Sequence, residues 1–307
     1  MKKILSKFVD TRLLKFFFSP IILYHSSFKT IPTEFKIGLH NLTPELIEEQ
    51  IYYLKKNFNI VSIDEYFKAK NKKGLASITF DDGYKNVIEN NKNIFIKFKI
   101  PVTIFIVTSS FEKKIFWRDK IRFIINNNLE EKFKNYLTKQ GIFIDNLYRD
   151  SKRKKYNSIS IENSIDKFLI KNNFHLEFNN HQFTSTDQLF DSEYFFYGSH
   201  SHNHYVMSSL SYEEQFEEIQ KSKKIIQQLN LNKSNLFSIP FGGTNDFDKY
   251  TILILKKLNY DGVLLSRNFL NPSNSNFFAD RLMPGDNDII ETIKINFFKT
   301  ILKRKVI

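Results

Sequence analysis

Short apolar runs alternate with segments of helical periodicity along most of this chain. Strands are predicted at residues 21–24, 59–62, 75–80, 102–107, 194–197, 236–239, 262–265 and 277–283. Helices are predicted between them, for example from Pro44, which Thr43 can cap, and over 212–229, where Ser211 and Glu214 form a capping-box pattern. Repeated strand–helix units predict an α/β fold with a parallel sheet, and their number fits a distorted or incomplete (β/α) barrel.

The alternation stops between about residues 109 and 193. This stretch is polar, rich in Asn and Lys, and mostly helical in pattern. We therefore predict a helical insertion over 109–193 within a single domain that spans residues 1–307. A chain of 307 residues with 41% hydrophobic side chains is long enough to bury one large α/β core.

The chain is strongly basic, with a net charge of +13. Such a charge favours anionic partners, but the basic residues are spread along the whole length, and a codon bias that favours Phe, Lys, Asn and Ile explains it equally well. The densest run, Lys152–Lys155, is predicted to be a solvated loop. No zinc-finger spacing or RNA-binding aromatic signature is present, so no nucleic-acid partner is predicted. The absence of cysteine excludes disulfides and thiolate metal ligands.

Neither end of the sequence resembles a membrane anchor. Charged residues such as Lys7, Asp10 and Arg12 interrupt the apolar stretch that a signal peptide would need. The basic, amphipathic segment 295–305 is predicted to be a packed terminal helix. We expect a cytoplasmic protein, for which peripheral contact with the inner face of a membrane stays open.

Two adjacent carboxylates end one of the buried strands. The apolar run Ala76–Phe80 leads directly into Asp81, Asp82 and Gly83. Carboxylates repel each other, and removing either from water is costly. A strand that ends in this pair is expected to have a cation there, or to share a proton for chemistry.

A histidine cluster follows the predicted strand at 194–197. His200, His202 and His204 are three of the seven histidines in the chain. On a helical turn, His200 and His204 would face the same way and could chelate one metal ion, with His202 pointing elsewhere. In an extended segment all three would share a face, so the spacing leaves both arrangements open.

Two further motifs follow predicted strands. In the segment Ser238–Gly243, proline fixes the backbone and glycine allows close approach of a ligand, so a backbone N–H could face developing negative charge, although an ordinary turn would have the same pattern. His25 follows the first strand, and its imidazole would suit proton transfer near pH 7. In a (β/α) barrel these strand ends meet on one face, where the chemistry takes place.

With these motifs the chain resembles the polysaccharide deacetylases, the NodB-like carbohydrate esterase family 4. Residues 79–83 match the TFDDG motif of that family, 200–204 fit its H-[ST]-x-x-H motif, and 238–242 fit its P-[YF]-G loop. The segments 23–25 and 116–119 also look like bacterial surface-glycan members of the family. The resemblance extends over most of residues 20–110 and 194–285.

The resemblance implies a role for each of these residues. Asp82, His200 and His204 would bind one divalent metal ion, with zinc favoured and Co, Ni, Fe or Mn also accepted by such a ligand set. Asp81 would be the general base toward the attacking water. The backbone N–H of Phe241 would hold the oxyanion together with the metal. The expected reaction is metal-assisted hydrolysis of an acetamide.

The sequence departs from the family pattern in two places. Many members have an arginine at the position of Ser238, which orients the base, and here we propose Arg281 in its place, with a surface salt bridge as the alternative. Many members also have a late catalytic histidine, but no histidine follows His204. Members with an early Tyr-His segment are thought to use that histidine as the acid, so His25 receives this role.

The leading hypothesis is an N-deacetylase of an N-acetylated sugar in surface-polysaccharide or lipid-linked glycan assembly. The expected partner is an N-acetylated glycan or a lipid- or nucleotide-linked sugar, and the basic charge suits a phosphate-bearing substrate. The alternatives are an inactive glycan-binding homologue, another metal-dependent amide hydrolase on the same fold, and a non-haem iron oxygenase, which also uses two histidines and one carboxylate.

Overall fold

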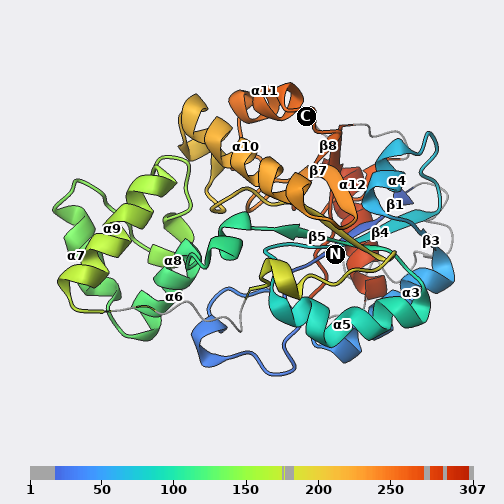
Figure 1. Cartoon of the computed structure of the whole chain (residues 1–307), viewed down its shortest axis with the longest axis horizontal. Coiled ribbons are helices and arrows are strands. Elements are labelled where there is room, and N and C mark those ends of the chain that lie inside the picture. The colour runs from blue at the N-terminus through green and yellow to red at the C-terminus, as the bar shows by residue number, and fades with distance from the viewer. Residues whose placement is uncertain (1–17, 175, 177–182, 273–276, 286–288, 304–307) are drawn as a thin grey trace.

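A parallel sheet that bends into a nearly closed barrel forms the centre of the molecule (Figure 1). The computed structural model describes residues 18–303 apart from 175, 177–182, 273–276 and 286–288. The strands of this sheet are β2 (Ile21–Tyr24), β3 (Asn59–Ile60), β4 (Leu75–Phe80), β5 (Val102–Ile106), β6 (Phe195–Ser199), β7 (Lys233–Ser238), β8 (Gly262–Leu265) and β10 (Phe278–Asp280). The predicted (β/α) barrel is therefore confirmed.

The strand order is β10-β8-β7-β6-β5-β4-β2, and β3 pairs with β4 off this path. Every pairing is parallel. The residue that follows β10 by two positions, Leu282, forms a parallel bridge with Ile22 of β2. Leu23 N–H donates to Leu282 O, and Leu282 N–H donates to Ile21 O, each at 2.8 Å. This short contact joins the two ends of the sheet and brings the carboxyl end of β10 beside that of β2.

Helices cover the outside of the barrel. They are α3 (Pro44–Asn57), α4 (Ile63–Lys68), α5 (Lys85–Phe98), α10 (Tyr212–Gln228), α11 (Lys249–Lys257) and α12 (Ile289–Lys303). The caps predicted for α3 and α10 are present: Thr43 accepts a hydrogen bond from Leu46 N–H, and Ser211 and Glu214 form a capping box. No helix in the described part of the chain is long and apolar enough to cross a membrane.

The terminal helix packs on the protein. In α12, Ile289 and Ile293 are buried, and the Thr300 hydroxyl accepts a hydrogen bond from Leu270 N–H. The ring of Phe297 lies edge-on to Phe18 at 5.5 Å between centroids. Phe18 belongs to β1 (Phe18–Ser19), which pairs antiparallel with β9 (Asn271–Pro272). The segment predicted as a helix at 295–305 is thus helical to Lys303, and its last residues, like the N-terminal segment, lie outside the described residues.

In the described residues between β5 and β6, four α-helices form a lobe at one side of the barrel (Figure 1). They are α6 (Trp117–Asn126), α7 (Glu130–Thr138), α8 (Leu147–Asp150) and α9 (Ser158–Lys171). Short 3₁₀ helices also occur in the described residues, at η1 (Thr33–Phe35), η2 (Thr108–Glu112), η3 (Thr186–Gln188) and η4 (Met207–Ser209). The apolar interior of the lobe is continuous with that of the barrel, and its buried residues include Ile121, Phe133, Leu137, Ile165 and Phe168.

Candidate active site

Side chains that follow β2, β4, β6 and β7 meet in one cavity of about 220 Å³. Because parallel strands present their carboxyl ends at the same edge, residues that are far apart in the sequence come together there. The lining residues are His25, Gly38, Leu39, His40, Asp81, Asp82, Phe116, Arg118, Arg122, Tyr148, Lys152, His200, His204, Phe241, Ser266 and Met283. Of the sequence-predicted site residues, all except Arg281 line this cavity, and Arg281 lies directly behind it.

Asp82, His200 and His204 form a buried triad. One potential ligand atom from each lies within 4.8 Å of those of the other two. Asp82 Oδ1 is 3.5 Å from His200 Nε2 and 3.4 Å from His204 Nε2. The segment after β6 turns, so that His200 and His204 face the same point. His202 points away and its Nδ1 contacts the hydroxyl of Thr108 at 3.0 Å. The histidine spacing allowed either a turn or an extended segment, and the structure has the turn.

The donor atoms of this triad suit a divalent cation. Two ligands at about 2.1 Å from a tetrahedral metal ion are roughly 3.4 Å apart, which matches the distances from Asp82 to both imidazoles. Asp82 Oδ1 is buried without a hydrogen-bond partner among the described residues. His200 Nδ1 lies 2.9 Å from the carbonyl oxygen of Ser238, which fixes the tautomer and leaves Nε2 as the ligand atom. Zinc fits this His₂-carboxylate set.

The environment of the triad disfavours the ionised form of Asp82 when no cation is bound. Burial, and after it the charge of Asp81, raises the pKa of Asp82 to about 8. Burial also lowers the pKa of His200, and burial together with His200 lowers the pKa of His204 well below its usual value. Both imidazoles are therefore neutral and able to ligate at pH 7, and a cation would restore the charge on Asp82.

Asp82→Asn is expected to stabilise the metal-free protein at pH 8. A carboxyl whose folded-state pKa is raised favours folding fully at low pH and loses that contribution as the pH rises from about 4 to about 8. Asparagine is neutral throughout, so we expect a gain of about 1–3 kcal/mol at pH 8 and little change at pH 4. Urea unfolding after chelation measures this difference.

With zinc bound, the wild type should become the more stable of the two proteins, because only the wild type keeps the carboxylate ligand. A ligand that binds the folded state alone raises the free energy of unfolding, by about 2.7 kcal/mol at a hundredfold excess over Kd. The assignment of Asp82 as a ligand would be contradicted by either of two results. The metal-free Asp82→Asn protein could be less stable than wild type at pH 8, or zinc could stabilise both proteins equally.

Asp81 is held by a buried arginine. Arg281 is fully buried, and its Nη1 and Nη2 atoms donate to the two carboxylate oxygens of Asp81 at 2.7 and 2.6 Å. The Ser238 hydroxyl lies 3.1 Å from both oxygens and accepts from Arg281 Nη2 at 2.9 Å. The alternative of a surface salt bridge for Arg281 is therefore wrong, because Leu282 pairs with β2 and turns the preceding side chain into the barrel.

The pairing with Arg281 gives the two adjacent carboxyl groups very different pKa values. Burial raises the pKa of Asp81, but the Arg281 charge and its hydrogen bonds outweigh that effect and lower the pKa to about 2. Asp81 is therefore ionised at neutral pH beside a protonated or metal-bound Asp82. The difference in pKa between neighbouring groups is typical of sites in which two carboxyls have different tasks.

His25 lies at the rim of the cavity, with a second histidine against it. The ring of His40 is edge-on to His25 at 5.4 Å between centroids, and His40 Nε2 lies 2.6 Å from the carbonyl oxygen of Pro284. Burial, and after it His40, lowers the pKa of His25 to about 3. The expectation that His25 titrates near pH 7 is thus wrong for the metal-free site, and its imidazole is neutral at that pH.

Strained backbone surrounds the triad. Asp82, Ser201, His204 and Phe241 have φ angles of +70°, +63°, +59° and +64°, although none of them is glycine. Non-glycine residues in this region cost free energy and gather at functional sites. The Phe241 ring lies edge-on to His204 at 4.6 Å, which places the Phe241 backbone beside the triad. Gly242 is required next to it, because a Cβ there would lie 2.5 Å from the Ser266 hydroxyl.

The lobe supplies a wall that the motifs did not predict. Trp117 Nε1–H donates to the carbonyl oxygen of His204 at 3.0 Å, and the Phe116 ring lies 4.9 Å from the His204 ring. Arg118 and Tyr148 from α6 and α8 complete this side of the cavity. The residues 116–119 were noted only for their similarity to surface-glycan deacetylases. Tyr148 and His40 have no recognisable signal in the sequence.

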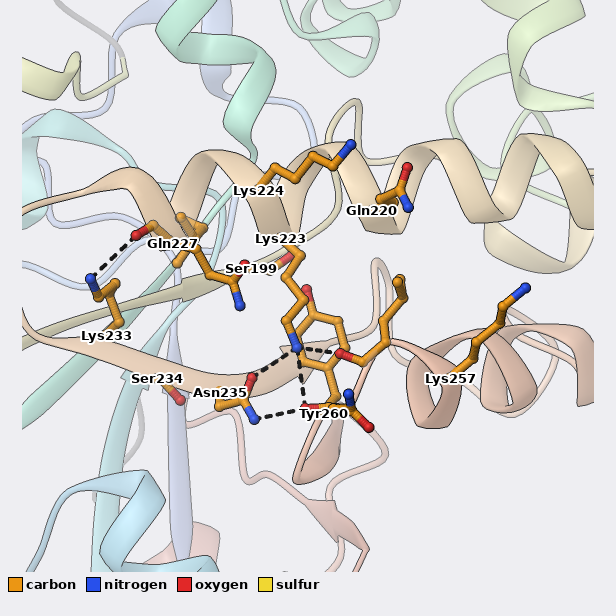
Figure 2. A pocket seen from close by; sticks show the side chains of 13 residues that line it. Ser199, Gln220, Lys223, Lys224, Gln227, Lys233, Ser234, Asn235, Lys257 and Tyr260 are labelled. Atoms are coloured by element: carbon orange, nitrogen blue, oxygen red, sulfur yellow. Dashed lines mark hydrogen bonds between the residues drawn. The ribbon is translucent and has the colours of Figure 1, made fainter.

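A larger cavity lies elsewhere and has a different character. It measures about 640 Å³ and lies between α10, β7 and α11. Figure 2 shows Lys223 at its centre, with the ammonium group donating to Asn235 Oδ1 and to the carbonyl oxygens of Leu258 and Asn259. The lysine thus ties the end of α11 to α10. This cavity holds none of the predicted site residues, so the smaller cavity is the candidate active site.

Comparison with known proteins agrees with this fold and with the motifs that line the cavity. Residues 177–263 match the family model described as "Polysaccharide deacetylase". A comparison with curated protein sequences gives no match. Among solved structures, the Streptococcus pyogenes deacetylase PplD in complex with acetate is similar at a TM-score of 0.59 and 16% identity, covering 91% of this chain and 97% of that one.

Two further deacetylase structures show the same fold. A de-N-acetylase from Aggregatibacter actinomycetemcomitans has a TM-score of 0.59 at 16% identity, covering 91% of this chain and 99% of that one. IcaB from Ammonifex degensii has a TM-score of 0.57 at 13% identity, covering 92% of this chain and 98% of that one. The three solved structures share the fold of this chain, and the family model matches the part of it that holds the histidine motif and the loop after β7, in agreement with the resemblance seen in its motifs.

Proposed function

We propose that this protein removes the acetyl group from an N-acetylated sugar in a metal-dependent hydrolysis. The observation that carries the proposal is the pairing of a buried Asp-His-His triad with a separate ionised aspartate at the same strand ends. Amide hydrolysis needs a polarised carbonyl, an activated water and protonation of the departing amine. The cavity offers a group for each need.

Asp82, His200 and His204 would hold the metal ion, for which zinc is the favoured candidate. When bound, the ion supplies a Lewis acid for the acetamide carbonyl and lowers the pKa of water. Asp81, fixed by Arg281 and Ser238, accepts the proton of the attacking water. The backbone N–H of Phe241 donates to the oxygen on which negative charge develops.

His25 is proposed as the acid that protonates the leaving amine. Since its imidazole is neutral at pH 7, it must first receive a proton, and the negative charge that develops in the cavity favours the protonated form. The proton that Asp81 takes from water passes on to His25, and the negative charge that this transfer restores on Asp81 raises the pKa of the imidazole. The neighbouring His40 lowers the pKa of His25 and so disfavours protonation of His25 before the reaction begins.

The arrangement also favours an active enzyme over an inactive glycan-binding homologue. That alternative rests on the missing arginine at Ser238 and the missing late histidine. Arg281 forms two hydrogen bonds to the base from another part of the chain, and His25 lines the same cavity. A non-haem iron oxygenase is disfavoured because those sites usually occur on β-sandwich folds, whereas these strands form a parallel barrel. We propose that the helical segment 109–193 is an insertion that closes one side of the substrate groove, and that the protein acts on glycan precursors in the cytoplasm.

Acetate release from N-acetylated sugars tests the proposed function. Protein loaded with zinc, chelated protein, and chelated protein with zinc added back are compared on N-acetylglucosamine oligomers. We expect acetate from the first and third samples and none from the second. Equal release from all three, or release of no acetate from any N-acetylated sugar, would contradict the proposal.

His25→Ala is expected to lower kcat for the acetamide by about a hundredfold, the size of a typical general-acid contribution. An activated ester such as 4-nitrophenyl acetate has a leaving group that needs no proton, so its hydrolysis should fall far less. The ratio of the two rates is the measurement. A similar loss on both substrates would show that His25 has another task.

A further inference from the structure

A third cavity, of about 550 Å³, opens beside the candidate active site. It is lined by Arg149, Lys152, Arg153, Lys154, Lys155, Phe241, Asn245 and Asp246. Lys152 and Phe241 line both cavities, so the two are contiguous. The densest basic run of the sequence, predicted to be a solvated loop, is therefore placed at the mouth of the site.

The positive charge of this loop is only partly neutralised. Asp150 pairs with Arg149 at 2.7 Å and with Arg153 at 2.9 Å, so one carboxylate serves two guanidinium groups. Among the described residues, no carboxylate oxygen lies within 4.0 Å of the ammonium groups of Lys152, Lys154 or Lys155. Asp246 is in the same cavity, but its Oδ2 accepts a hydrogen bond from Gly243 N–H at 2.7 Å. The cavity keeps a clear excess of positive charge.

Arg118 adds a buried cation on the catalytic side. It is 3% exposed, donates to Ser151 Oγ at 2.9 Å and to Tyr148 O at 2.6 Å, and stacks on the Tyr148 ring at 4.1 Å. Within the described part of the chain it has no carboxylate within 4.0 Å. Burial lowers its pKa to about 10, so it remains charged at neutral pH. A buried cation without a counterion is costly, and a substrate anion would offset that cost.

Lys152 connects this charge to the reacting group. Its side chain is half-buried, and its ammonium lies 5.1 Å from the centre of the Phe241 ring. The backbone of Phe241 is the proposed donor to the oxyanion. An anion bound by Lys152 would thus lie next to the acetamide that reacts, within the size of one sugar unit.

We propose that the substrate is an N-acetylated sugar that carries a phosphate ester, and that Arg118, Lys152, Lys154 and Lys155 bind this phosphate. The inference rests on the proposed deacetylation. Four cations without a carboxylate partner suit a doubly charged phosphate better than a single carboxylate. Lysine and arginine side chains with free N–H donors are the usual protein ligands of phosphate.

The test compares matched substrates and matched variants. The substrates are N-acetylglucosamine, its 1-phosphate and 6-phosphate, and N-acetylmuramic acid as the carboxylate control. The variants are Lys152→Met, which keeps the aliphatic stem, and Lys154→Ala/Lys155→Ala. The control is Lys132→Ala/Lys139→Ala, which removes the same charge as the double loop variant at two exposed lysines that line neither cavity.

We expect a KM about tenfold lower for a phosphorylated sugar than for the neutral and carboxylate sugars in the wild type. The loop variants should reduce this preference about tenfold, and the control should leave it unchanged. Added salt should weaken the preference as well. Comparing UDP-N-acetylglucosamine with a polyprenyl-diphosphate-linked N-acetylglucosamine in detergent distinguishes a free nucleotide sugar from a lipid-linked one.

Equal KM values for neutral and phosphorylated sugars, or the same loss in the control variant, would overturn the phosphate subsite while leaving deacetylation intact. If no sugar releases acetate, calorimetric titration with N-acetylglucosamine 1-phosphate decides the question independently. Binding that weakens about tenfold in Lys152→Met would then support the subsite and refute the proposed function. Absence of binding would overturn both.

Discussion

Asp81→Asn is expected to lower kcat for acetate release by about a thousandfold or more while one metal ion stays bound. Asparagine has nearly the same shape but cannot accept the proton of the attacking water, and a general base contributes roughly a hundredfold to ten-thousandfold. The metal triad does not include Asp81, so the metal content should not change. Acetate release and metal analysis on the same sample measure both quantities.

Ser238→Ala is the matched control for this substitution. It removes one hydrogen bond to Asp81 and leaves both Arg281 contacts in place. We expect a loss in kcat of about tenfold to a hundredfold, smaller than that of Asp81→Asn, since one hydrogen bond to a charged group contributes about 1.5–3 kcal/mol. If Asp81→Asn retains turnover near the wild-type rate, Asp81 is not the base.

Arg281→Met should produce the largest loss of stability, about 3–5 kcal/mol, because it leaves the Asp81 carboxylate buried without its partner. Burial alone raises the pKa of Asp81, so without Arg281 this pKa should rise and the acid limb of the pH–rate profile should move to higher pH. Urea unfolding at pH 7 and a pH–rate profile are the measurements.

The double variant Asp81→Asn/Arg281→Met separates the two roles of this pair. Both charges are then absent, so most of the stability lost in either single variant should return, whereas activity should not. Additive losses of stability in the double variant would show that the two side chains do not depend on each other, contrary to the contacts at 2.6 and 2.7 Å.

The barrel was predictable because its strands are short apolar runs separated by clear helix signals. β4 has the predicted bounds, and α10 begins at the predicted capping box. The ends of other elements differ by a few residues. β6 runs on to Ser199 because it stays paired with β5 as far as Ile106, and Gly198 is required there because a Cβ would lie 2.5 Å from the Phe105 ring. Such a contact between strands far apart in the sequence has no local signal.

The site was predictable only where its residues form compact motifs. Asp81, Asp82, His200 and His204 stand next to strand ends, so topology alone brings them together. The environment of Arg281 depends on how Leu282 closes the barrel against β2, and a surface salt bridge was an equally good reading of the sequence. The low pKa of His25 results from burial and from His40, a residue on a loop without any motif.

The basic loop shows the same limit. Lys152–Lys155 has the composition of a solvated segment, and only the packing of the lobe on the barrel places Lys152 over Phe241. The basic composition suited a phosphate-bearing substrate, but the sequence did not show which basic residues lie beside the cavity. Position relative to the reacting group is a property of tertiary structure.

Titration of metal-free protein with zinc, with acetate release measured after each addition, tests the central claim most directly. The triad predicts that activity rises in proportion to zinc and reaches a plateau at one equivalent, and that His200→Ala shows no such rise. Full activity without metal, or a plateau that His200→Ala reaches at the same equivalent, would contradict a deacetylase whose metal ion is held by Asp82, His200 and His204.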